Sequence, residues 1–336
     1  MKIITAIVSA VLTGLVALAP ASAQETPQFV LAWGRNGSGN GQFSEILGVA
    51  ADDLGNVFVA DANNYRIQKF TRDGIHLASW GQFGTGNSQF NVPWGVGVDG
   101  DGNVYVADVN NHRIQKFSGL GVYVTQWGSL GSSNGQFNRP VRVAADLDGN
   151  ILVADANNHR IQKFTNNGSY LSQFGSSGTG NGQFQDPCGL AVGPDGSIYV
   201  SEAVGNRVQK FTANGVYVLQ WGSYGDQTGQ FDFPAEVAVD GSGDVYVADA
   251  SNHRIQKFDS SGAFILAWGS LGNGSGQFRD PAGLAIQGDD LFVGDSNNDR
   301  VQRFSNPFAP VLPATWGGLK HRYGAPATAP GLPDRP

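Results

Sequence analysis

The sequence predicts an all-β protein, a six-bladed β-propeller built from four-stranded antiparallel blades. Two observations lead to this fold class: an aromatic and apolar pattern recurs at a fixed interval, and each recurring unit divides at turn residues into four short apolar segments. The units show no 3.6-residue apolar period of the kind that helices require. Four antiparallel strands in a unit of this length are typical of a propeller blade.

The interval is 47 residues, and phenylalanine marks it most clearly. A tryptophan stands ten residues before each of these phenylalanines, except that Phe174 takes its place in the fourth unit. The spaced phenylalanines are Phe43, Phe90, Phe137, Phe184, Phe231 and Phe278. Six equal units without charged spacers predict a single closed ring.

The second unit shows how a blade is expected to form. Its apolar segments cover residues 95–99, 104–107 and 112–117, and a fourth ends at Trp127. We name the four segments strands a to d, in chain order. Turn residues such as Asn and Gly separate them, and both residue types accept the positive φ angles that tight hairpins need.

The ring is expected to close through an N-terminal strand. Residues 28–33 (QFVLAW) resemble strand d of the fifth unit, residues 263–268 (AFILAW), and therefore supply strand d of the sixth blade, whose other strands come from residues 283–304. The alternative closing strand, residues 311–316, contains Pro313, and proline removes a donor from a strand ladder.

Both ends of the chain are expected to lie outside the propeller, which spans residues 24–304. The apolar run that follows Lys2 and the small residues before Gln24 indicate a secretory signal peptide, residues 1–23, cleaved after Ala23. A retained membrane anchor is the alternative, but the run is short for a span. Residues 305–336 hold seven of the fifteen prolines and are expected to form an extended tail. The predicted location is periplasmic or extracellular, with no membrane span after cleavage.

Charge and cysteine content limit the classes of partner. The formal net charge is -7, and charged residues make up 15% of the chain. A basic face for nucleic acid or anionic lipid is therefore not expected. The single cysteine excludes a disulfide framework and a cysteine-based zinc ribbon. We expect a monomer without a cofactor whose partner is a protein, a peptide or a glycan.

A specific motif joins strands b and c. The segments DANNYRIQKF (61–70), DVNNHRIQKF (108–117), DANNHRIQKF (155–164) and DASNHRIQKF (249–258) each follow an apolar strand and resemble NHL repeats. The resemblance covers nearly all of residues 28–304 and implies a six-bladed propeller. It implies little about chemistry, because relatives include RNA-binding ends of TRIM-type proteins, sensor domains of bacterial receptor kinases and the peptidyl-amidating lyase, and related six-bladed folds host lactonases.

Residues that recur in every unit are interpreted as architecture. Each unit has an arginine five residues after an acidic residue, as in Asp61 and Arg66, and such a pair can bond across a hairpin. His112, His159 and His253 occupy equivalent b–c turns, too far apart in a ring to share one zinc ion.

Two other recurring motifs are interpreted as connections. The glycine-rich segments such as residues 37–43 lack the Lys-Ser/Thr of a phosphate-binding loop and are expected to cross from strand d to the next strand a. Residues 99–103 and 146–150 lack the glycine and glutamate of a calcium loop and are expected to be hairpin turns.

Departures from the repeat are the candidate ligand-binding residues. Glycine begins strand a in four units, but Arg142 and Glu236 replace it in the third and fifth, and Trp94 and Cys188 stand just before this position. Three further departures replace histidine at the b–c turns: Tyr65, Asn206 and Asp299. These seven residues are predicted to line a shallow pocket of mixed charge at the channel rim, suited to a polar ligand or a peptide. The alternative is neutral drift at a solvated rim.

Two function classes remain open. The favoured one is a non-enzymatic binding or scaffold propeller that recognises a peptide, protein or glycan on the channel-rim face, since no nucleophile stands beside a unique base and no catalytic residue is assigned. The alternative is a metal-dependent lyase or lactonase, using calcium or zinc, in which Glu236, Glu45 and Asp299 reach the axis.

Overall fold

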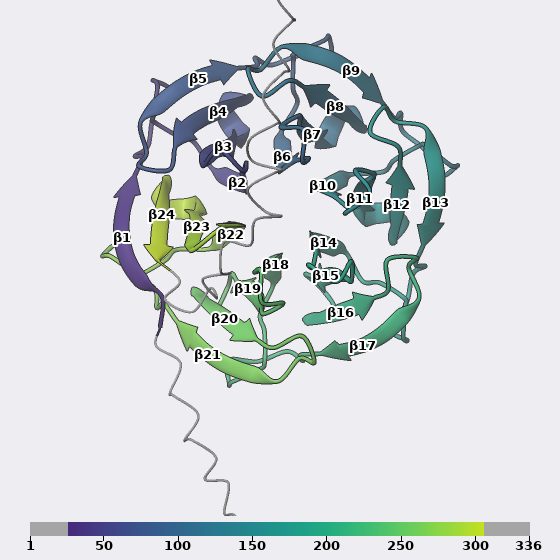
Figure 1. The fold of residues 1–336 in the computed structure, drawn as a ribbon, viewed down its shortest axis with the longest axis vertical. Coiled ribbons are helices and arrows are strands. Elements are labelled where there is room, and N and C mark those ends of the chain that lie inside the picture. The colour runs from purple at the N-terminus through teal and green to yellow at the C-terminus, as the bar shows by residue number, and fades with distance from the viewer. Residues whose placement is uncertain (1–25, 306–336) are drawn as a thin grey trace, which may run out of the picture.

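The computed structural model describes residues 26–305, and it confirms the predicted fold class. Six four-stranded antiparallel sheets form a ring (Figure 1), and each sheet is one blade. Among the described residues, no helix is long and apolar enough to cross a membrane. The predicted signal peptide and proline-rich tail lie outside the described residues, as does the alternative closing strand.

Each blade runs from strand a at the axis to strand d at the perimeter. Blade 1 contains β2 (Ile46–Ala51), β3 (Asn56–Asp61), β4 (Arg66–Thr71) and β5 (His76–Trp80). Blade 2 contains β6 (Pro93–Val98), β7 (Val104–Asp108), β8 (Arg113–Phe117) and β9 (Tyr123–Trp127). Blade 3 contains β10 (Pro140–Ala145), β11 (Ile151–Asp155), β12 (Arg160–Phe164) and β13 (Tyr170–Phe174). Blade 4 contains β14 (Pro187–Val192), β15 (Ile198–Glu202), β16 (Arg207–Phe211) and β17 (Tyr217–Trp221). Blade 5 contains β18 (Pro234–Val239), β19 (Val245–Asp249), β20 (Arg254–Phe258) and β21 (Phe264–Trp268).

Blade 6 closes the ring with strands from both ends of the described chain. It contains β22 (Pro281–Gln287), β23 (Asp290–Asp295), β24 (Arg300–Ser305) and, as its strand d, β1 (Gln28–Trp33). β1 pairs antiparallel with β24, with Phe29 opposite Phe304 and Trp33 opposite Val301. The predicted N-terminal closure is therefore confirmed.

The b–c turns are short 3-10 helices in four blades, and they set the strand bounds. These helices are η1 (Ala62–Asn64), η2 (Val109–Asn111), η3 (Ala156–Asn158) and η4 (Ser296–Asn298). His112, predicted as the first residue of a strand, instead has a left-handed φ of 51° that ends η2, so β8 begins one residue later. β6 begins at Pro93, two residues before the predicted start, because Pro93 lies opposite Asp108 across a shift in register.

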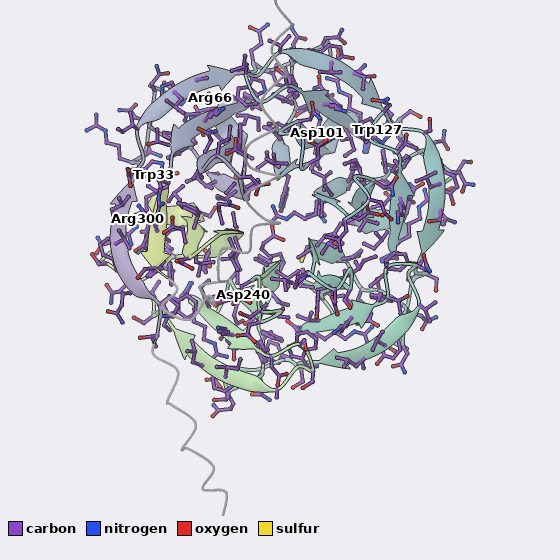
Figure 2. All side chains as sticks on the ribbon, viewed as in Figure 1. Trp33, Arg66, Asp101, Trp127, Asp240 and Arg300 are labelled. Carbon is purple, nitrogen blue, oxygen red and sulfur yellow. The ribbon has the colours of Figure 1, made fainter. Side chains whose placement is uncertain are left out.

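The core lies between neighbouring blades. The recurring phenylalanine at the end of each connector is fully buried, as Phe43 is, and Phe43 packs against Phe70 with ring centroids 5.6 Å apart. Trp33 of blade 6 packs against the same ring of blade 1, 5.9 Å away. Trp33 and Trp127, labelled in Figure 2, hold equivalent positions at the ends of outer strands. The contact of a strand-d aromatic ring with the strand-c phenylalanine of the next blade joins two blades and recurs at all six interfaces, so the repeat spacing itself builds the ring.

The recurring acid and arginine form an ion pair in every blade, as predicted. In blade 1, the Asp61 carboxylate is fully buried and accepts hydrogen bonds from Arg66 Nε (2.7 Å), Gln68 Nε2 (3.0 Å) and the Ser44 N–H (2.8 Å). Arg66 also donates to the carbonyls of Gly39 and Gln42 in the connector, so the pair ties the b–c turn to the connector. The same ion pair occurs at Asp108–Arg113, Asp155–Arg160, Glu202–Arg207, Asp249–Arg254 and Asp295–Arg300.

Candidate ligand-binding bowl at the channel mouth

The connectors and b–c turns meet on one face of the ring, and a cavity of about 370 Å³ opens at the axis on that face. We call this cavity the bowl. Its lining comes from three repeat positions at or just before the start of strand a, the third of them represented by Arg142 alone, and from b–c turns of blades 5 and 6. The lining residues are Glu45, Leu47, Trp94, Arg139, Val141, Arg142, Asp186, Cys188, Phe233, Ala235, Ala250, Ser251, Asp280, Ala282, Ser296 and Asn297.

The residue just before strand a has a left-handed backbone in all six blades, although none of the six is glycine. We call these six residues the rim. Their φ angles lie between 53° and 64°. The rim consists of Glu45, Val92, Arg139, Asp186, Phe233 and Asp280. A side chain in this conformation costs roughly 1–2 kcal/mol relative to the right-handed one, and the side-chain chemistry differs around the ring. All rim residues except Val92 line the bowl.

Side chains of the b–c turns support the rim. The Glu45 N–H donates to Asp299 Oδ1 (3.0 Å), and the Phe233 N–H donates to Asn206 Oδ1 (3.0 Å). His112 Nδ1 accepts from the N–H of Arg139 in the same way (3.3 Å), as His253 does from Asp280 (3.2 Å). The supporting residue always belongs to the preceding blade, so each of these bonds also links two blades.

The structure therefore separates the seven predicted site residues. Trp94, Arg142 and Cys188 line the bowl together, whereas Tyr65, Asn206 and Asp299 are not part of its lining. Asn206 and Asp299 support rim residues. Tyr65 packs edge-on against the connector residue Phe83, with ring centroids 5.1 Å apart.

Arg142, in the floor of the bowl, forms a buried ion pair with the seventh residue, Glu236, which is not part of the bowl lining. Arg142 Nε lies 2.7 Å from Glu236 Oε2, and the two residues are 2% and 4% exposed. We predicted a shallow pocket lined by both side chains. In the structure the two charged groups are instead buried and paired with each other. Glu236 borders a second cavity of about 210 Å³, and Arg142 borders both cavities, so the pair lies between them.

The pair connects five of the six blades. Arg142, from blade 3, donates to the carbonyls of Leu47 in blade 1 (2.9 Å) and Ala282 in blade 6 (2.8 Å). Glu236, from blade 5, accepts from the N–H of Leu190 in blade 4 (3.3 Å). Burial raises the pKa of Glu236 to about 7, even though Arg142 acts in the opposite direction.

Glycine in the other blades leaves room for this pair. A Cβ atom built on Gly48 would lie 3.1 Å from Arg142 Nη1 and 2.4 Å from the Trp94 carbonyl oxygen. A Cβ atom on Gly189 would lie 2.8 Å from the Glu236 Cα. A side chain at either glycine would therefore collide with strand a of the next blade and, at Gly48, with the Arg142 guanidinium.

The wall of the bowl combines aromatic and charged groups. The Arg139 guanidinium lies over the Trp94 ring, 5.1 Å from its centroid, and 3.1 Å from Asp186 Oδ1. Phe233 is 41% exposed, which is high for a phenylalanine in a folded domain. Glu45 has no side-chain partner among the described residues.

The geometry limits both the reactivity of Cys188 and the places where a metal ion could bind. The Cys188 thiol is buried and donates to the Pro234 carbonyl (3.1 Å), and burial raises its pKa to about 12, so it stays protonated at neutral pH. Within residues 26–305, no group of three or more His, Cys, Asp or Glu side chains could hold a metal ion. Asp99, from one of the calcium-like segments, instead accepts hydrogen bonds from the N–H groups of Asp101 (3.1 Å) and Asn103 (2.8 Å) in its own hairpin turn.

The rim as a set was not predicted from the sequence. One pattern in the sequence could have indicated it. In five units the recurring phenylalanine is followed by one polar residue, then by the rim residue, which varies, and then by a recurring proline. Of the rim, only Glu45 was considered, as a possible metal ligand. Because none of the six residues is glycine, nothing in their identity indicates a left-handed backbone.

Fold and site together define a six-bladed β-propeller with a ligand-sized cavity at one channel mouth. Comparison with family models then identifies its repeats. Five of the six units match the NHL repeat, at residues 43–70, 90–117, 137–164, 231–258 and 278–304, and the chain is an NHL-repeat propeller. The fourth unit, which has Glu202 in place of the recurring aspartate, lies outside these matches, yet it folds as a blade with the Arg207–Glu202 ion pair at 2.6 Å.

Solved structures share the fold at low sequence identity. A protein of unknown function from Bacteroides thetaiotaomicron has a TM-score of 0.64 at 17% identity, over 82% of this chain and 76% of its own. A gluconolactonase from Xanthomonas campestris has a TM-score of 0.61 at 16% identity, over 86% and 99%. Virginiamycin B lyase from Staphylococcus aureus has a TM-score of 0.54 at 16% identity, over 77% and 80%. A search of curated proteins found no match. Identities this low show the fold alone.

Proposed function

We propose that this protein is a non-enzymatic binding propeller that holds a peptide, protein or glycan ligand in the bowl. The observation that carries the proposal is the rim. Six non-glycine residues adopt a left-handed backbone at one structural position, and five of them line a single cavity. The left-handed backbone itself recurs in every blade, as it also does at the b–c turn residue, and is architecture. The side chains that it presents to one cavity differ from blade to blade, and they are the reason to propose function there.

The contrast between rim and scaffold supports the same proposal. The ion pairs and phenylalanines of the scaffold recur in all six units, whereas the rim carries carboxylate, aliphatic, guanidinium and aromatic groups. A scaffold requirement would favour one residue type at all six positions, and glycine would satisfy this backbone without strain. Varied chemistry around one cavity is what recognition of an asymmetric ligand needs.

Filling the bowl tests the proposal. Ala282→Trp places a large ring in the bowl, and Ala213→Trp, at an exposed c–d turn, is the matched control. Each variant is probed at about 100 μM with an array of random dodecapeptides and with a glycan array, a range that detects even weak complexes. We expect the wild type and Ala213→Trp to capture the same probes and Ala282→Trp to lose them. Capture that survives in Ala282→Trp, or no capture by the wild type, would contradict the proposal.

A further inference from the structure

We infer that the bowl selects a polypeptide partner by a single basic side chain, lysine or arginine, that enters the cavity. The inference rests on the proposed function of the bowl and specifies its ligand. Three features of the bowl carry it: the balance of charge, the aromatic groups and the surface that surrounds the opening.

The charged groups that face the bowl leave an excess of negative charge. Arg142, in the floor, and Glu236 neutralise each other. The rim then contributes three carboxylates, Glu45, Asp186 and Asp280, against the single guanidinium of Arg139, and three minus one leaves two uncompensated negative charges. A buried or half-buried excess of this kind favours a cationic ligand.

The two carboxylates that lack a lysine or arginine partner lie on neighbouring blades. Glu45 of blade 1 has no side-chain partner among the described residues. Asp280 of blade 6 accepts a hydrogen bond from Asn297 and lies 3.4 Å from His253 Nδ1. Asp186, on the far side of the ring, is already paired with Arg139. The binding position for a cation is therefore the side formed by blades 6 and 1.

The bowl already accommodates one guanidinium in the way proposed for the ligand. Arg139 lies between the Trp94 ring and the Asp186 carboxylate, and both contacts come from groups that line the cavity. On the other side, Phe233 of blade 5, whose ring is exposed, and Asp280 of blade 6 line the same cavity from adjacent blades. An aromatic face beside a carboxylate is an arrangement that favours an ammonium or guanidinium group.

Cavity size and the surrounding surface favour a polypeptide over a small amine. A volume of about 370 Å³ is near the lower end for ligand cavities, so it suits one side chain of a larger partner. The third residue after strand d is an apolar or aromatic side chain in four units and is 58–71% exposed. These residues are Phe83, Leu130, Tyr224 and Leu271. Each lies in the connector, on the face on which the bowl opens, and Phe83 packs against the b–c turn residue Tyr65. A partner with a basic anchor flanked by apolar residues contacts both regions, as in interfaces with a central anchor.

Matched peptide libraries test the inference. The probes are fluorescein-labelled peptides in which five mixed residues drawn from Gly, Ser, Leu and Phe flank a central Arg, citrulline or Glu on each side. Citrulline keeps the shape of arginine without its charge. We expect the wild type to bind the Arg library at least about tenfold more tightly than the citrulline library, and the Glu library least.

Variants of the rim locate the preference. Glu45→Gln with Asp280→Asn is expected to remove most of the difference between the Arg and citrulline libraries, with Glu45→Gln alone as a milder variant if the pair fails to fold. Asp226→Asn, an exposed carboxylate in a connector outside the bowl lining, is the control and should keep the full difference.

The outcomes distinguish the ligand class from the site. Equal binding of all three libraries by the wild type, or no binding of the Arg library at about 1 mM, overturns the inference. If binding shows no preference for Arg but Ala282→Trp still abolishes it, the basic anchor is wrong and the proposed site stands. If Ala282→Trp binds the Arg library as tightly as the wild type does, both the basic anchor and the bowl as the binding site are wrong. Capture of glycans alone also overturns the inference and leaves the site intact.

Discussion

The arginine–carboxylate pairs that recur in every blade and the pair at the axis differ in what they join. The six recurring pairs, such as Asp61–Arg66, link the b–c turn of one blade to its own connector. The single pair Arg142–Glu236 has a similar N to O distance, 2.7 Å, but crosses the axis and bonds to five blades. The first kind builds each blade, and the second fixes blades relative to one another.

The comparison shows that a departure from a repeat is not by itself a ligand contact. Arg142 and Glu236 break the glycine pattern, yet their charged groups form an ion pair with each other and hydrogen bonds to backbone groups. The rim breaks the repeat as well, but there the side chains remain accessible in a cavity. The accessible departures are the ones that we assign to binding.

The largest expected effect comes from breaking the axial pair. Arg142→Ala leaves Glu236 buried without its partner, and we expect the free energy of unfolding to fall by about 3–5 kcal/mol. Replacing both residues with methionine removes both buried charges and should recover most of this loss. Urea denaturation of the two variants measures the difference. If the double variant is as unstable as Arg142→Ala, the loss in free energy of unfolding comes from removing the ion pair and not from leaving the Glu236 charge unpaired.

The pH dependence of stability should reveal the same carboxylate. Burial raises the pKa of Glu236 from 4.5 to about 7, so between these values the folded state holds a proton that the unfolded state has lost. The free energy of unfolding should therefore fall as pH rises from about 4.5 to about 7, by about 1–3 kcal/mol from this group. Denaturation across this range in the wild type and in Glu236→Gln isolates the contribution. If the free energy of unfolding changes with pH in the same way in both proteins, Glu236 does not make this contribution.

A recurring pair should matter less than the axial one. Asp61→Asn keeps the shape of the side chain but removes its charge beside Arg66, which retains its bonds to the connector carbonyls. We expect a loss of about 1.5–3 kcal/mol, the range for hydrogen bonds to a charged group, because the amide keeps part of the bonds that the Asp61 carboxylate makes. The same substitution at Asp249 provides a matched measurement in another blade. A loss larger than that of Arg142→Ala would reverse the ranking of the two kinds of pair.

The smallest effect is expected at the rim, with the opposite sign. Val92 is β-branched and has a φ of 60°, so Val92→Gly should relieve strain and raise the free energy of unfolding by about 0.5–1 kcal/mol. Val216→Gly, at an exposed position outside the left-handed region, is the control and should destabilise. Destabilisation by both variants would show that the rim backbone is not strained.

The sequence predicted the fold well because the ring is a sum of local repeats. Constant spacing of Phe43 and its equivalents dictates identical blades, and the likeness of residues 28–33 to another strand d indicates how the ring closes. These inferences need only the pattern along the chain, and the sheet order confirms them.

The site was predicted only in part, because it depends on directions in space. Trp94, Arg142 and Cys188 do line one cavity, but Arg142 and Glu236 are 94 residues apart and meet only because the ring brings the inner strands of blades 3 and 5, on either side of blade 4, to the same axis. Nothing along the chain shows whether a charge points outward to a ligand or inward to a partner. The supporting role of Asn206 and Asp299 likewise depends on the next blade.

Replacing the whole rim tests the central claim most directly. In one variant, Glu45, Val92, Arg139, Asp186, Phe233 and Asp280 all become glycine, which fits their left-handed backbone. We predict a thermal unfolding midpoint equal to or above that of the wild type, together with complete loss of binding to the probes that the wild type captures. A large fall in the midpoint, or binding that persists, would show that these side chains serve the scaffold and that recognition lies elsewhere.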